Sequence, residues 1–186
     1  MSKPPKLYID TGVFIDLAKH KAELLVDDEA KRNVWFTQQL LEASRNRDVI
    51  VITSILTVAE CTHLKDGRPI PPEDIKRFYD GLLCSGKGGV TLTQSTFTIV
   101  ERARNLRWIH GVYLGGTDSV HVASAMDRGC TEMLTTDLKI LGSAAKLAEL
   151  GLRVAKPFDT ELLPSAYRQM TLDSGLKPGA ASGKAS

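Results

Sequence analysis

The chain has 186 residues, of which 42% are hydrophobic and 25% are charged, and its formal net charge is +2. This length and composition are typical of one globular domain with its own core, and the small net charge does not by itself indicate a nucleic-acid partner. The 3 cysteines are an odd number without C-x-x-C spacing, which disfavours a disulfide framework or a zinc site. No apolar stretch reaches membrane-spanning length. We therefore expect a cytoplasmic protein without a membrane partner.

Five short apolar segments are typical of β-strands, and stretches with helical periodicity separate them. The predicted strands are Lys6–Asp10, Val49–Thr53, Val90–Gln94, Glu132–Thr136 and Leu152–Ala155. The predicted helices run from a cap at Asp28 to about Asn46, from a cap at Ser54 to about Leu64, from Pro72 to about Leu83, from a cap at Ser95 or Thr96 to about His110, from Thr117 to about Arg128, and from Asp137 to Leu150. Apolar strands that alternate with helices predict an α/β fold, with right-handed crossovers and a parallel sheet covered on both faces.

The end of the chain differs in composition from the rest. Residues 1–160 contain all the predicted strands and helices and are expected to form one domain, with residues 161–186 as a C-terminal tail. From about Asp173 this tail is rich in Gly, Ala, Ser and Lys and has little to bury. We therefore expect it to be disordered from there on.

Four carboxylates occupy equivalent places in this scheme. Asp10 ends the first strand, and Glu60 lies in the helix that follows the second strand. Asp118 lies at the start of a helix, and Asp137 directly follows the fourth strand. Because the carboxyl ends of parallel strands line the ligand crevice of an open sheet, these acids are expected to converge although they are distant in sequence.

Carboxylates that converge repel one another unless a cation compensates their charge. A hard divalent cation such as Mg²⁺ prefers oxygen ligands, keeps several waters, and supports in-line attack on phosphorus. The acids therefore predict a metal site suited to phosphodiester hydrolysis. An Asp after a strand is also a typical helix N-cap, which is the alternative role for Asp118 or Asp137 taken singly.

Four stretches resemble the motifs of the PIN domain family. Residues 8–15 (YIDTGVFI) resemble its opening motif, hhhDTNhhhxh with h apolar, although Gly12 stands where Asn is commoner, and residues 57–60 (TVAE) resemble its second motif. Residues 116–125 (GTDSVHVASA) are similar to DAxHxAxA, the most specific match, and residues 134–139 (LTTDLK) resemble the closing TxD motif. The order and rough spacing agree, and the resemblance covers about residues 6–156.

This resemblance implies a three-layer α/β/α domain with a central parallel sheet. It also implies a Mg²⁺- or Mn²⁺-dependent endoribonuclease whose products carry 5′-phosphate and 3′-hydroxyl ends. Asp10, Glu60, Asp118 and Asp137 would then take both the catalytic and the metal-binding roles. Many bacterial members resemble VapC toxins of toxin–antitoxin pairs, which implies a homodimer and a small antitoxin partner. This chain is longer than the typical toxin, which weakens the toxin assignment more than the nuclease one.

Several neighbours of these acids are candidates for supporting roles. Thr11 and Thr136 flank catalytic acids and could bind a phosphate or orient a carboxylate, with strand-end capping as the alternative. His121 follows Asp118 by one helical turn and is expected either to pack as a helix histidine or to touch substrate or a carboxylate. Asp16 is expected to be a surface residue.

Basic and aromatic residues interleave in the segment before Asp118. Arg102 and Arg107 are candidates for binding the RNA substrate, and Trp108 and Tyr113 flank this basic cluster. Such interleaving is typical of surfaces that stack on RNA bases, but core packing is the expected role of Trp108.

Two other functions are compatible with part of this pattern. A phosphatase of the haloacid dehalogenase type also begins with an Asp after a strand, but it requires D-x-D, and here Gly12 removes the second acid. A noncatalytic RNA- or protein-binding scaffold on the same fold is the other alternative, which tight RNA binding without metal-dependent cutting would identify.

Overall fold

The computed structural model of the protein describes residues 3–64, 67 and 69–169. The tail from Asp173, for which we predict disorder, lies outside these residues, as does part of the turn-rich stretch before Pro72. Within the described residues, no helix combines the length and the apolar character needed to cross a membrane.

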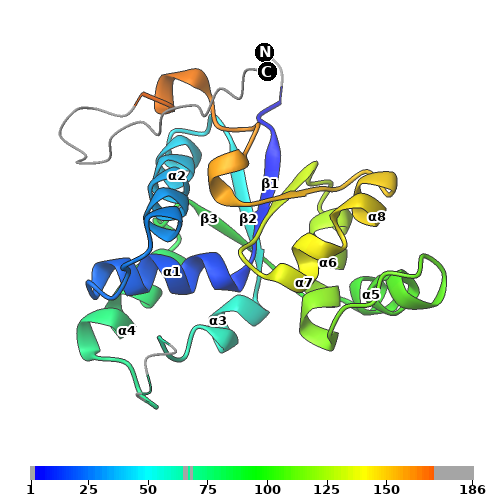
Figure 1. Cartoon of the computed structure of the whole chain (residues 1–186), viewed down its shortest axis with the longest axis horizontal. Helices are drawn as coiled ribbons and strands as arrows, with labels where there is room; N and C mark the ends of the chain where they lie inside the picture. Colours follow the sequence, from blue (N-terminus) through cyan, green and yellow to red (C-terminus); the bar gives the residue numbers. More distant parts are fainter. Residues whose placement is uncertain (1–2, 65–66, 68, 170–186) are drawn as a thin grey trace, which may run out of the picture.

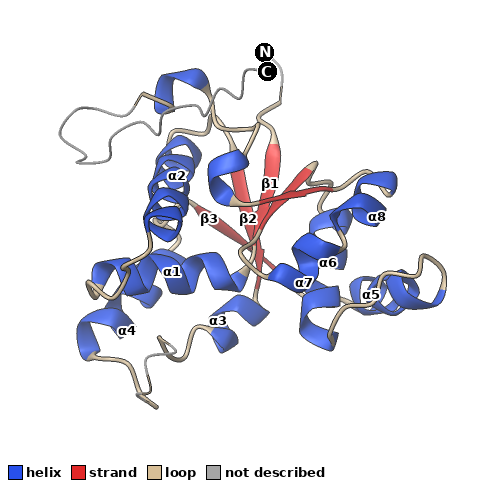
Figure 2. Cartoon of the chain, in the orientation of Figure 1, coloured by secondary structure: helices blue, strands red, loops and turns tan. Residues whose placement is uncertain are grey.

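A five-stranded sheet forms the centre of the fold (Figure 2). Its strands are β1 (Lys6–Ile9), β2 (Ile50–Ser54), β3 (Val90–Thr93), β4 (Glu132–Leu134) and β5 (Arg153–Ala155). They lie in the order β3-β2-β1-β4-β5, and every neighbouring pair is parallel. The predicted parallel sheet is therefore confirmed: four of the predicted strands are present with shorter bounds, and β2 has the predicted length but is shifted by one position.

Helices cover both faces of the sheet (Figure 1). They are α1 (Thr11–Lys21), α2 (Asp28–Arg45), α3 (Leu56–Glu60), α4 (Glu73–Tyr79), α5 (Phe97–Trp108), α6 (Gly116–Asp127), α7 (Leu138–Gly142) and α8 (Ala144–Glu149). A π-helical turn, η1 (Asp80–Cys84), and two 3₁₀ turns, η2 (Pro157–Asp159) and η3 (Ser165–Tyr167), complete the elements. Helices α1 and α2 lie on one side, α6 and α8 on the other, and α5 packs on α6, which confirms the three-layer α/β/α architecture.

Each face of the sheet packs into its own hydrophobic cluster, as the alternating side chains of β1 show. Leu7 and Ile9 point into the cluster that contains residues of α1, α2 and α4, while Tyr8 points into the cluster that contains residues of α6, α7 and α8. All three side chains are fully buried. Because successive side chains of a strand point to opposite faces, a strand covered on both sides is apolar at most of its positions.

The strand order reverses beside β1. From β1 the chain continues to β2 and β3 on one side, and it then returns to place β4 and β5 on the other side. The crevice outside the carboxyl ends of the strands at such a reversal is the usual ligand site of an open α/β sheet. Asp10 follows β1 directly, and Asp137 lies shortly after β4, so the sequence places two of the predicted acids at this point.

Two predicted helices are shorter than expected. The helix after β2 was expected to reach Leu64 but ends at Glu60, because Cys61 leaves the helical conformation with φ −76° and ψ 53°. The N–H of Thr62 then bonds the carbonyl of Glu60 at 2.8 Å, which turns the chain away. The segment expected as one helix from Asp137 to Leu150 is two helices, α7 and α8, which meet at Ser143.

Two further differences concern helix placement. Helix α1 was not predicted at all, although it follows Asp10 directly. The helix expected from Pro72 to Leu83 is α4 followed by the π-helical turn η1, in which the N–H of Ser85 bonds the carbonyl of Asp80, five residues earlier. Such an extra residue in a turn widens the helix locally.

Candidate functional site

A cavity of about 650 Å³ lies at the carboxyl end of the sheet. All four predicted acids, Asp10, Glu60, Asp118 and Asp137, line it. Its other lining residues include Thr11, Gly12, His121, Thr136, Leu138 and Lys139. The structure therefore brings together carboxylates from the ends of β1, α3, β4 and the start of α6.

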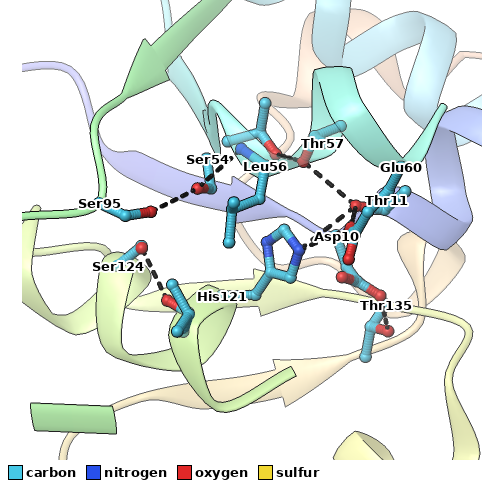
Figure 3. A network of polar contacts seen from close by, with 12 residues as sticks. Asp10, Thr11, Ser54, Leu56, Thr57, Glu60, Ser95, His121, Ser124 and Thr135 are labelled. Carbon is cyan, nitrogen blue, oxygen red and sulfur yellow. Dashed lines mark hydrogen bonds and ion pairs between the residues drawn. The ribbon is translucent and has the colours of Figure 1, made fainter. Parts of the chain in front are cut away.

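Asp10 is the most buried of these acids, with 6% of the residue exposed. Its backbone N–H bonds the carbonyl of Leu134 across the sheet at 3.0 Å, and its Oδ2 accepts a hydrogen bond from the Thr135 hydroxyl at 2.8 Å (Figure 3). Burial raises the pKa of the Asp10 carboxyl, and the hydrogen bond from Thr135 opposes this rise only in part. A carboxylate held in this position therefore favours a cation beside it.

Glu60 is held by two donors that both bind its Oε2 atom. The Thr11 hydroxyl donates at 2.5 Å, and Nε2 of His121 lies at 2.9 Å. Hydrogen bonding to His121 lowers the pKa of Glu60, against a smaller opposing effect of burial. Neither bond uses Oε1, so the second carboxylate oxygen is not occupied by them.

The ring of His121 is itself fixed from behind by Tyr8. His121 is 1% exposed, and its Nδ1 lies 2.7 Å from the Tyr8 hydroxyl. That hydroxyl already accepts the backbone N–H of Ser54 at 2.8 Å, so its own proton is directed to Nδ1. Nδ1 is then the acceptor and Nε2 the donor, which fits the bond from Nε2 to Glu60. Figure 3 shows the ring lying between Thr11 and the start of α3.

The role of His121 was left open between packing and contact with a carboxylate, and the structure shows both. The part played by Tyr8 was missed, because its partner lies 113 positions away in the sequence. The available signal was a tyrosine in a strand otherwise built of aliphatic residues, since a buried Tyr hydroxyl usually has a hydrogen-bond partner.

Asp118 lies in the first turn of α6 and is half-buried. A Cβ atom at Gly115 would lie 3.0 Å from its Oδ2, so a larger residue there would press on the carboxylate. Glycine at this position therefore leaves the Asp118 side chain room at the cavity.

Asp137 caps the following helix and also lines the cavity. Its Oδ1 accepts the N–H groups of Lys139 at 2.7 Å and Ile140 at 3.4 Å. The N-cap role considered as the alternative is therefore present, and it occupies one oxygen. The two roles are compatible, because Oδ2 makes neither of these bonds.

Of the two flanking threonines, Thr11 holds Glu60 and Thr136 lies beside Gly12 in the cavity wall. A Cβ atom at Gly12 would lie 3.2 Å from the Thr136 hydroxyl, so Thr136 fills space that a side chain at Gly12 would need. The expectation for Asp16 was wrong: its side chain is 16% exposed, and its two oxygens bind Lys19 and the Thr136 hydroxyl. Asp16 thus helps to hold the cavity wall.

The two arginines proposed for substrate binding do not line the acidic cavity. Arg102 lines a separate groove between α5 and α6, and the guanidinium of Arg107 lies 5.4 Å from the centre of the Tyr113 ring. The expectation that Trp108 packs in the core was wrong, because 70% of this residue is exposed.

The donors in the cavity suit a hard divalent cation, since all four acids offer carboxylate oxygen. In the part of the chain that the structure describes, no three acidic, His or Cys side chains lie close enough to form a metal site as they stand. Closing the site therefore requires movement of side chains, and the half-buried Asp118, Asp137 and Glu60 have room for it. The chemistry of the residues fits Mg²⁺ or Mn²⁺, while the coordination geometry remains to be formed.

Comparison with known families gives a match over most of the chain. Residues 7–147 match the family model of the PIN domain. No curated protein matches the chain.

Proposed function

The chain belongs to the PIN domain family, and from this premise we propose that it is a Mg²⁺- or Mn²⁺-dependent endoribonuclease. Members of this family are generally metal-dependent nucleases. The observation that carries the proposal is the convergence of Asp10, Glu60, Asp118 and Asp137 on one cavity at the reversal of strand order. Acids at this place suit cleavage of a polyanion only if a cation reverses the local charge.

In this proposal each acid has a defined task. Asp10, Asp118 and Asp137 hold the cation, and Glu60 completes the set through the oxygen that Thr11 and His121 leave unbound. The chemistry that Mg²⁺ or Mn²⁺ would supply at these residues is positive charge to offset that of the phosphate and activation of water for attack on phosphorus.

The protein's other groups hold this arrangement and receive the substrate. Tyr8 and Thr11 fix His121 and one oxygen of Glu60, and Thr135 orients Asp10, so these two acids are held in place while Asp118 and Asp137 move to close the site. Lys139 is exposed at the cavity and can pair with a phosphate, and the Thr136 hydroxyl lies in the cavity wall beside Asp137.

The finer form of the proposal is a VapC-like toxin, active as a homodimer and inhibited by a small antitoxin. It is supported by the sequence motifs around the four acids. A gene for a small DNA-binding protein next to the gene of this chain would favour the toxin. Without such a neighbouring gene, the protein would be a nuclease of another kind.

The proposed function is tested by mapping the ends of RNA fragments. Total cellular RNA is incubated with the protein in Mg²⁺, with an EDTA reaction as background, and new 5′ ends are sequenced after selection for 5′-phosphate. We expect new internal ends that carry 5′-phosphate and 3′-hydroxyl groups in the Mg²⁺ reaction alone.

The rival functions predict different results in the same experiment. A phosphatase would release phosphate from a small phosphoester and create no internal ends. A scaffold would bind RNA and leave it uncut. Either result would refute the endoribonuclease.

A further inference from the structure

We propose that the exposed rings of Trp108 and Tyr113 form a stacking surface for the unpaired bases of a single RNA strand. The surface, called here the aromatic–basic face, consists of Arg104, Arg107, Trp108, Tyr113 and Lys146. The inference rests on the proposed ribonuclease function and adds a surface outside the cavity that binds its substrate.

The rings are large apolar groups that the fold leaves in solvent. Trp108 and Tyr113 are each 70% exposed. On α5 the buried residues are Ile99, Ala103 and Leu106, so Trp108 lies off the core-facing side of the helix. Nothing in the packing of α5 therefore requires an aromatic residue at this position.

Each ring has a cation over it. The guanidinium of Arg104 lies 4.6 Å from the centre of the Trp108 ring, and that of Arg107 lies 5.4 Å from the centre of the Tyr113 ring. The ammonium of Lys146 lies 5.7 Å from the Tyr113 ring and donates to the carbonyl of Gly111 at 2.6 Å. This bond ties α8 to the loop that carries Tyr113.

The charge of the face favours a polyanion. Arg104 pairs with Glu101 at 3.2 Å, whereas Arg107 and Lys146 have no acidic partner within salt-bridge distance among the described residues. Aromatic rings interleaved with such cations bind single-stranded nucleic acid, because bases stack on the rings while the cations neutralise phosphates. A duplex would not suit the rings, since its bases are already stacked on one another.

The aromatic–basic face lies close to the acidic cavity along the chain at two points. Tyr113 and Asp118 are separated by 5 positions, so their Cα atoms lie at most roughly 18 Å apart. Lys146 belongs to α8, which directly follows α7, and the first residues of α7, Leu138 and Lys139, line the cavity. In Figure 1, α5, α6, α7 and α8 lie on the same side of the sheet. A strand held on the rings can therefore continue into the cavity.

The test measures RNA affinity without relying on cleavage. The Asp10→Asn protein, in Mg²⁺, is titrated into a labelled single-stranded RNA of about twelve nucleotides, within the range of known single-strand sites. Trp108→Ala and Tyr113→Ala, each added to this protein, are expected to weaken binding about tenfold, the size of one base–ring stack. Trp108→Phe keeps a ring and is expected to retain most of the affinity.

Phe97→Ala is the matched control. Phe97 begins the same helix and is 80% exposed, but no cation of the described residues lies over its ring. We expect its removal to change the affinity less than about twofold. In the otherwise unchanged protein, Trp108→Ala should raise KM for a long single-stranded RNA and leave kcat unchanged, because it removes binding that ground state and transition state share.

The results separate this inference from the proposed function. RNA cleavage together with unchanged affinity in both alanine variants would refute the stacking surface and leave the nuclease. Loss of RNA affinity in the alanine variants, together with an unchanged protein that cuts no RNA in Mg²⁺, would support the surface and refute the nuclease. A changed sedimentation coefficient in Trp108→Ala, with unchanged RNA affinity, would assign the face to a second copy of the chain and overturn the inference.

Discussion

The Asp10→Asn protein is expected to lose RNA cleavage by at least about 100-fold while keeping its fold. Changing an outer partner of a metal ligand already costs about 10–100-fold in metal affinity or activity, so loss of a proposed ligand should cost more. Asn retains an oxygen that can accept the bond from Thr135, and it removes a buried charge. Rates are measured on a single-stranded RNA in Mg²⁺, and the fold is checked by circular dichroism and thermal unfolding.

Asp127→Asn is the matched control for this experiment. Asp127 is a half-buried carboxylate at the last position of α6, the helix that begins next to the cavity, and it does not line the cavity itself. Its replacement should leave the cleavage rate within about twofold. Full activity of Asp10→Asn would remove Asp10 from the mechanism, and a parallel loss in Asp127→Asn would show that the effect is not specific to the cavity.

The second large effect is expected from Glu132, at the opposite end of the sheet. This glutamate is 1% exposed, at the first position of β4. Its carboxylate accepts bonds from the Arg153 guanidinium and the Thr160 hydroxyl, and from the N–H of Glu161 at 3.1 Å. Arg153 also donates to the carbonyl of Asp159 at 3.0 Å. These bonds hold the segment after β5 against the sheet.

Glu132→Ala is expected to lower the free energy of unfolding by about 3 kcal/mol, because it leaves buried donors without a partner and opens a cavity. For a chain of this length that corresponds to a decrease in Tm of about 6–12 °C. Glu161→Ala is the control, since the Glu161 carboxylate pairs with the same Arg153 at 3.3 Å but is 73% exposed. Removing such a surface pair should cost less than about 1 kcal/mol. Equal Tm values for the two variants would show that burial of Glu132 does not increase its contribution to the free energy of unfolding.

The sequence predicted the sheet well because most of its strands are buried on both faces. These strands are mainly apolar, β3 alternates apolar and polar residues, and helices separate the strands, so the type and chain order of the elements follow from the pattern. Placing Asp10 and Asp137 at one edge needed only the rule that parallel strands end on the same side. The strand order, and therefore the reversal beside β1, comes from contacts between distant segments.

Helix lengths were predicted less well, for local reasons. Helix α1 begins directly after Asp10 with Thr11 and Gly12, neither of which is a strong helix former. Helix α3 ends at Glu60 because the backbone turns at Cys61. No residue type in that stretch predicts this turn. Tertiary contacts decide both boundaries.

Trp108 is a different case, because the signal was present. The buried residues Ile99, Ala103 and Leu106 follow helical spacing, and Trp108 lies two positions past Leu106, off that stripe. The general preference of tryptophan for the interior outweighed the periodicity in the prediction, and the periodicity was right. By contrast, the tyrosine in β1 indicated that its buried hydroxyl has a partner, but no local pattern could identify that partner as His121, which lies in an element remote in sequence.

The central claim is that Asp10, Glu60, Asp118 and Asp137 form a pocket that binds a divalent cation. The most direct measurement is a calorimetric titration of Mn²⁺ into the protein without RNA, repeated with Asp10→Asn and with Asp118→Asn. We expect the unchanged protein to bind Mn²⁺, and each variant to bind it at least about tenfold more weakly. Mn²⁺ binding of equal strength in all three proteins, or no binding to the unchanged protein, would contradict the claim.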